Sequence, residues 1–153
     1  MKLTSILFVS NLLLFSGCTQ ATDHKIQSAT IQQLKWFQQQ DHFLPDNFLY
    51  TGVNDPQLKQ KLNQSVAKTS QAFIKLYESP TPPTKQQLLK TLSDGIHQID
   101  PNSLDTEDRE QVAVTYEKFL DITGLESSEG ILNTWLYNEE INELIEQQKS
   151  AKQ

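Results

Sequence analysis

Cysteine is almost absent from this sequence of 153 residues, which contains one, Cys18. A single cysteine excludes an intramolecular disulfide and a metal site built from several thiolates. A hydrophobic core alone must therefore hold the folded part of the chain together. The length suits one such core and is too short to make two domains a reasonable expectation.

The sequence also lacks an apolar run long enough to cross a membrane. Residues 3–15 are almost wholly apolar, but a transmembrane helix needs about 20 such residues. Lys2 precedes this run, and the polar stretch TQATDHK follows it where a stop-transfer signal would have basic residues. A positive start followed by a short apolar middle is the layout of a secretory signal peptide.

The apolar run ends in FSGC, residues 15–18, and this ending resembles the lipobox of bacterial lipoproteins. The resemblance implies cleavage between Gly17 and Cys18 and attachment of lipid to the Cys18 thiol. Acyl chains stabilise membrane binding by about 0.8 kcal/mol per buried CH₂, so such an anchor would be permanent. The alternative interpretation is that Cys18 is a small buried residue of a terminal helix.

These patterns divide the chain into three parts. The expected parts are a cleaved signal peptide at residues 1–17, a lipidated cysteine and polar tether at 18–25, and a single helical domain at 26–149. In lipoproteins an Asp directly after the cysteine favours the inner membrane, and Thr19 stands there instead. We therefore expect a cell-envelope protein, on the periplasmic side of the outer membrane if the host is Gram-negative.

Positive charge is scarce in the second half of the chain. Residues 93–153 carry four Lys or Arg against fourteen Asp or Glu, whereas residues 18–92 carry eight Lys against five acids. Nucleic-acid binding needs clustered cations, so this distribution argues against it. An acidic surface would instead attract a basic protein partner. The plainer interpretation is a solvated helix face.

The spacing of apolar residues predicts an all-α fold of about five helices, in an antiparallel bundle or an irregular helical array. Asp55–Pro56, the Thr84–Gln87 pair and Asp105 are typical of helix starts. Gly124 is typical of a helix end. The predicted helices span 26–40, 56–78, 84–99, 105–123 and 127–149. Residues 48–53 are the one candidate for a short extended segment.

Each predicted helix has apolar residues on one face, and these residues should form the core. The expected core residues are Ile31, Leu34, Trp36, Phe37, Leu58, Leu62, Val66, Phe73, Leu76, Leu88, Leu92, Ile96, Ile99, Val112, Tyr116, Phe119, Leu120, Ile131, Leu132, Trp135, Leu136, Ile141, Leu144 and Ile145.

Metal-binding patterns are missing from the sequence. His24, His42 and His97 do not occur in a spacing such as HExxH, and we expect no metal or cofactor. The acidic stretch at 100–111 invites comparison with a calcium loop. However, an aspartate occupies the position of the turn glycine and Gln111 that of the bidentate glutamate. Helix capping explains these acids better.

The stretch GLESSEG, residues 124–130, raises the question of catalysis. It lacks the flanks and the preceding strand of a GxSxG nucleophile elbow. The Glu126–Ser127 pair is similar to that of lytic transglycosylases, which implies Glu126, or the nearby Glu129, as the acid of a muramidase-type reaction. The glycine-rich and aromatic motifs of those enzymes are missing here. Such an acid would also have to be buried to raise its pKa.

The loop at residues 41–55 is long for a compact domain and places several aromatic residues beside His42. Its aromatic side chains are those of Phe43, Phe48 and Tyr50. One interpretation is a small-ligand site. The alternative is that these residues pack onto the core and hold the loop in place.

The stretches LDTEDREQ and LDITGLESSEGILNTWLY are similar to a small bacterial family known as a domain of unknown function, family 4844, over about residues 25–140. The resemblance implies a compact helical domain and no known activity. Our functional expectation is a lipid-anchored, non-catalytic protein-binding module of the inhibitor or immunity type. The alternatives are a cell-wall enzyme of muramidase type and a small-ligand binding protein.

Overall fold

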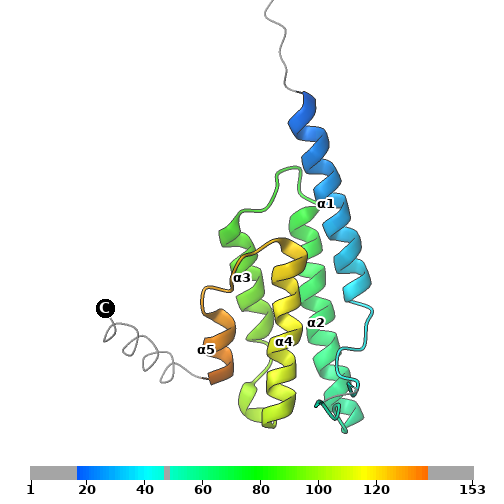
Figure 1. Cartoon of the computed structure of the whole chain (residues 1–153), viewed down its shortest axis with the longest axis vertical. Helices are drawn as coiled ribbons and strands as arrows, with labels where there is room; N and C mark the ends of the chain where they lie inside the picture. Colours follow the sequence, from blue (N-terminus) through cyan, green and yellow to red (C-terminus); the bar gives the residue numbers. More distant parts are fainter. Residues whose placement is uncertain (1–16, 47–48, 138–153) are drawn as a thin grey trace, which may run out of the picture.

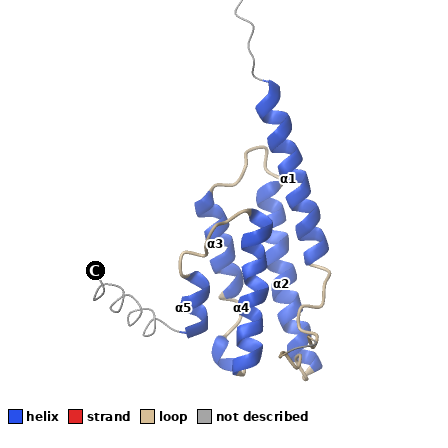
Figure 2. Ribbon diagram, viewed as in Figure 1, coloured by secondary structure: helices blue, strands red, loops and turns tan. Residues whose placement is uncertain are grey.

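The computed structural model describes residues 17–46 and 49–137 (Figure 1). Its elements in chain order are α1 (Gly17–Phe37), α2 (Pro56–Tyr77), α3 (Lys85–Ile96), the 3-10 turn η1 (Pro101–Ser103), α4 (Thr106–Thr123) and α5 (Ile131–Tyr137). The described ranges contain helices and loops and no strand (Figure 2). The prediction of an all-α fold of about five helices is confirmed.

Helices α1 to α4 lie side by side along the long axis, and successive helices run in opposite directions (Figure 1). α1 packs mainly on α2, α2 packs also on α3 and α4, and the short α5 contacts α3 and α4. The arrangement is therefore an antiparallel bundle in its first four helices. None of the described helices has the length and apolarity needed to cross a membrane.

The helix starts follow the predicted capping chemistry. The Asp55 carboxylate accepts a hydrogen bond from the Gln57 backbone at 2.9 Å, and Pro56 occupies the first turn of α2. Thr84 and Gln87 form the predicted capping box of α3. Asp105 caps α4, and Gly124 ends that helix with a left-handed φ of +74°. Capping thus accounts for much of the acidic stretch at 100–111.

Helix α1 starts earlier than predicted. The sequence placed a polar tether at 18–25 and a helix from residue 26, but the backbone is helical from Gly17. No glycine or proline interrupts the chain between residues 18 and 44, so nothing in the backbone breaks the helix there. Figure 1 shows that the first turns of α1 extend beyond the other helices.

The loop at 41–55 has no strand in its described part. Two backbone hydrogen bonds fold it on itself: Val53 N donates to Phe43 O at 3.2 Å, and Asp46 N donates to Tyr50 O at 3.0 Å. The short extended segment suggested at 48–53 is therefore an irregular loop where the structure describes it. Phe48 lies outside the described residues.

The core consists of one cluster to which all five helices contribute. At its centre the rings of Phe37, Phe73 and Tyr116 surround that of Phe119, with ring centroids 5.1 to 5.4 Å from it. Most of the predicted core residues of the described helices are buried or packed against this cluster. Trp36 is the exception, because it is 64% exposed. The prediction that Trp36 is a core residue is wrong.

Helix α5 is attached to the bundle through Trp135. This residue is 3% exposed, and its indole Nε1 donates a hydrogen bond to Ile99 O at 2.9 Å. The buried indole therefore has the polar partner that it requires. The predicted continuation of the last helix, with Ile141, Leu144 and Ile145, lies outside the described residues.

Candidate functional site

The exposed Trp36 forms one wall of a groove of about 410 Å³ between the end of α1 and the second half of α4. The groove is lined by Trp36, Phe37, Gln40, His42, Lys118, Asp121 and Ile122. Its lining surface is mainly apolar. An exposed tryptophan beside an apolar depression is a feature of binding surfaces. We call this depression the Trp36 groove.

His42 is half-buried at the Trp36 groove and is held there by several contacts. The centroid of its ring lies 4.3 Å from that of the Phe37 ring, and its Nε2 donates a hydrogen bond to Phe37 O at 2.9 Å. Its backbone N donates to Asn63 Oδ1 at 3.1 Å. Burial lowers the pKa of His42, although the Phe37 carbonyl and the Asp41 carboxylate act in the opposite direction. His42 is therefore a rigid, neutral wall of the groove near pH 7.

The stability of the protein should fall on mild acidification because of His42. The unfolded chain binds a proton near pH 6.5 and the folded chain only at lower pH. The contribution of His42 is therefore complete above pH 6.5 and is lost as the pH falls below it. We expect the melting temperature of His42→Gln to depend less on pH than that of the unmodified protein between about pH 7.5 and 5.5. His97→Gln, a change at an exposed histidine, is the control. An equally steep pH dependence in His42→Gln would contradict this assignment.

The other described aromatic residues of the 41–55 loop face the core. Phe43 is fully buried, and Tyr50 is 8% exposed. The Tyr50 hydroxyl donates a hydrogen bond to the buried Asp108 carboxylate at 2.8 Å. Burial, followed by the Asp108 hydrogen bond, raises the pKa of Tyr50. Tyr50 therefore ties the loop to α4, and the Phe43 and Tyr50 side chains belong to the core and not to the lining of the Trp36 groove.

The two candidate acids of a muramidase-type site lie in the exposed connection between α4 and α5. The Glu126 side chain is exposed, so the burial that an acid catalyst requires is missing there. Glu129 has a positive φ of 50° and forms an ion pair with Lys85 at 2.5 Å. Glu129 thus links this connection to the start of α3.

Acidic residues form a row along the solvent side of α4. Glu107, Glu110, Glu117 and Asp121 are all exposed, and the 48% exposed Val114 lies between them. Their spacing of three or four residues places them on one side of the helix. Asp121 is also part of the Trp36 groove and forms an ion pair with Lys118 at 3.5 Å. We call these five residues the α4 face.

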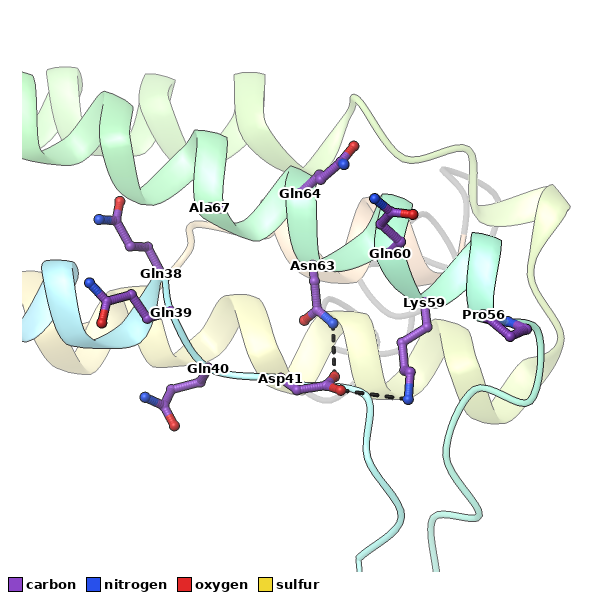
Figure 3. Close-up of a pocket in the computed structure, with 10 residues that line it drawn as sticks. All are labelled: Gln38, Gln39, Gln40, Asp41, Pro56, Lys59, Gln60, Asn63, Gln64 and Ala67. Atoms are coloured by element: carbon purple, nitrogen blue, oxygen red, sulfur yellow. Dashed lines mark hydrogen bonds and ion pairs between the residues drawn. The ribbon is translucent and has the colours of Figure 1, made fainter.

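A second groove, of about 510 Å³, lies between the end of α1 and the first half of α2 (Figure 3). Its lining residues are Gln38, Gln39, Gln40, Asp41, Pro56, Lys59, Gln60, Asn63, Gln64 and Ala67. Six of these ten residues have amide side chains. We call this depression the amide groove.

The described residues form no metal cluster, and their structure does not test the predicted lipid site. Among the residues that the structure describes, no three His, Cys, Asp or Glu side chains are close enough to hold a metal ion. Gly17 and Cys18 begin α1, and residues 1–16 lie outside the described residues. Signal cleavage and lipid attachment at Cys18 therefore stay predictions.

Comparison with known proteins gives the chain a family. The model of a domain of unknown function, DUF4844, matches residues 24–140. The chain belongs to the DUF4844 family. The predicted resemblance to family 4844 is thereby confirmed. The DUF4844 chain is also similar to the crystal structure of a DUF3571 family protein from Acinetobacter baumannii AYE. The two are 60% identical with a TM-score of 0.74, and the similarity covers 79% of this chain and 98% of that one. No curated protein matches the DUF4844 chain significantly.

Neither groove of this DUF4844 protein was predicted from its sequence. The Trp36 groove combines α1 with residues about 80 positions later in the chain. The amide groove had a sequence signal, because QQQ at 38–40 and Gln60 with Gln64 at helical spacing are unusual concentrations of glutamine.

Proposed function

We propose that this protein is a non-catalytic protein-binding module, held at the cell envelope by lipid on Cys18, that binds a basic segment of a partner protein. The observation that carries the proposal is the position of the apolar Trp36 groove next to the acidic α4 face. Together they form one continuous surface, because Asp121 belongs to both. The acidic half of the sequence is consistent with the same function.

The Trp36 groove offers the apolar part of this interaction. Trp36 and Ile122 can cover one or two apolar side chains of a partner, and a rigid indole costs little entropy when it becomes buried. His42 and Phe37 form a wall that is already fixed by hydrogen bonding and ring packing. Binding would therefore need little reorganisation of this protein.

The α4 face determines the charge of the partner. Its four carboxylates are exposed, and only Asp121 has an ion-pair partner among the described residues. Such a surface attracts Lys and Arg side chains and repels acidic proteins and anionic lipid. The expected partner segment is therefore amphipathic, with an apolar side chain for the groove and cations for α4.

A charge-reversal experiment tests this surface. We expect the full chain to bind an amphipathic peptide with lysines on one face and leucines on the other. Affinity should fall about tenfold or more when ionic strength rises from about 0.05 to about 0.5 M. At low salt, the double variant Glu110→Lys with Glu117→Lys should bind the peptide more weakly than the unmodified protein. Trp36→Ala should weaken binding at all salt concentrations. Isothermal titration calorimetry measures all of these affinities.

The matched control is Asp94→Lys with Glu126→Lys, which changes the net charge equally at exposed positions away from the α4 face. This control should keep most of the affinity. A loss of the same size in both double variants would contradict the assignment of the site, as would binding that is insensitive to salt. Proteins captured from an envelope extract should show the same dependence on the two double variants.

The anchor has a separate test. Cell fractionation should find the unmodified protein with the membranes and the Cys18→Ser variant in the soluble fraction. Retention of Cys18→Ser in the membrane would contradict lipid anchoring and leave the protein-binding proposal to be decided by the peptide experiment.

A further inference from the structure

The amide groove has a different chemistry from the α4 face. Its two apolar lining residues are Pro56 and Ala67, and its charged ones are Asp41 and Lys59. These charges form an ion pair with each other at 3.6 Å. The groove is therefore nearly neutral, which disfavours phosphate, metal ions and strongly charged peptides, and it has little surface for an apolar ligand.

Most of the amides in this groove are available for a ligand. Within the described part of the chain, the side chains of Gln38, Gln39, Gln60 and Gln64 form no hydrogen bond to another residue. Figure 3 shows that two of these come from the segment after α1 and two from α2. Each amide offers two donors and one acceptor oxygen. These amides would offer a ligand in the groove both donors and acceptors.

Asp41 fixes the shape of the groove between its two walls. Its Oδ1 accepts hydrogen bonds from Asn63 Nδ2 at 2.8 Å and from Phe43 N at 3.2 Å, while Oδ2 faces Lys59. These contacts join the segment after α1 to α2 (Figure 3). The small Ala67 leaves room at one end. The concavity is therefore built into the fold by interactions that do not use the four available glutamines.

From this geometry we propose that the amide groove binds a neutral glycan. Hydroxyl and acetamido groups of a sugar donate and accept hydrogen bonds in the same way as the glutamine amides, so the two can pair without a charged partner. A peptide is the less suitable ligand. Known peptide-binding modes use a sheet edge, an apolar or aromatic groove, or an arginine cluster, and none of these lines the amide groove.

The test uses the full chain in detergent and a tetramer of β-1,4-linked N-acetylglucosamine as the probe. We expect saturable binding with a dissociation constant of about 1 mM or tighter. In NMR spectra the side-chain amide signals of the groove glutamines should shift during the titration. A hyaluronan tetrasaccharide of the same size, which carries carboxylates, should bind more weakly because the groove has no unpaired cation.

Two glutamine variants decide between this site and unspecific binding. Gln60→Ala and Gln64→Ala lie on the exposed side of α2, so the fold should be retained, and each should weaken binding roughly fivefold. Gln71→Ala, an exposed residue of the same helix outside the groove, should bind like the unmodified protein.

Absence of saturable binding would overturn the proposal, and so would an equal loss in Gln71→Ala. Shifts of the groove amides with a neutral peptide but not with the tetrasaccharide would overturn it in favour of a peptide site. The proposed protein-binding surface is tested by other residues, so either proposal can fail alone.

Discussion

Phe119→Ala is expected to lower the free energy of unfolding by about 4 kcal/mol. Phe119 is fully buried, and its ring contacts those of Phe37 on α1, Phe73 on α2 and Tyr116 on its own helix. Truncation to alanine removes the ring that makes all three aromatic contacts and leaves a cavity. Because the three neighbouring rings belong to separate helices, they cannot all move inward to fill it.

Denaturant unfolding followed by circular dichroism measures this loss, and the melting temperature should fall by about 12 °C. Phe119→Leu is the matched control, since it keeps most of the volume and should cost about 1 to 1.5 kcal/mol. A loss below about 1 kcal/mol in Phe119→Ala would contradict the central position of this ring. The result also matters for function, because Phe119 fixes α4, which carries the acidic face, to α1, which carries Trp36.

The helix boundaries were predictable where local chemistry determines them. Asp55, Thr84 and Asp105 each accept a hydrogen bond from a backbone N–H within the next three residues. Such a bond depends on residues that are neighbours in the sequence. The start of α1 was mispredicted because a polar stretch without proline or glycine is compatible with both a tether and a helix.

The exposure of Trp36 depends on tertiary packing. Trp36 and Phe37 are adjacent apolar residues, and their order in the sequence does not show which one faces the core. In the structure α2 and α4 cover the side of α1 that carries Leu34 and Phe37, so Trp36 falls outside the buried arc. Periodicity defines the direction of a helix face and not its width.

The candidate sites were the least predictable part. His42 was singled out, but its partners at the groove, Lys118 and Ile122, lie on a helix that is distant in sequence. Glu126 was singled out because of the residue beside it, and the structure leaves it exposed. A motif identifies residue types, whereas chemistry depends on burial and on partners that only the fold brings together.

A substitution at Gly95 tests the closest approach between two helices. Gly95 of α3 lies against Thr69 of α2, and three Thr69 side-chain atoms lie within 3.0 Å of the position that a methyl group at residue 95 would occupy. Thr69 cannot simply rotate away, because its hydroxyl is hydrogen-bonded to Ser65 O at 2.9 Å and to the Tyr116 hydroxyl at 3.0 Å. Gly95→Ala must therefore move α3 or break these bonds.

The sign of the change in the free energy of unfolding on Gly95→Ala shows whether helix propensity or side-chain packing dominates at this position. Helix propensity alone predicts a gain of about 1 kcal/mol, whereas overpacking predicts a loss of about 3 kcal/mol. We expect a net loss of about 2 kcal/mol, and a larger one for Gly95→Val. Gln86→Ala, an exposed change in the same helix, is the control and should have little effect.

A double-mutant cycle with Thr69→Ala tests whether contact with Thr69 causes the destabilisation by Gly95→Ala. Alone, Thr69→Ala should destabilise the protein by about 1 to 3 kcal/mol, since the buried Tyr116 hydroxyl loses its partner. The double variant should lose less free energy of unfolding than the sum of the two single variants, by at least about 1 kcal/mol, because the methyl group added at residue 95 then has room. Additive losses, or a stabilising Gly95→Ala, would mean that α2 and α3 are not in close contact at this point. The geometry of α2 also positions the amide groove, so this contact bears on that site as well as on stability.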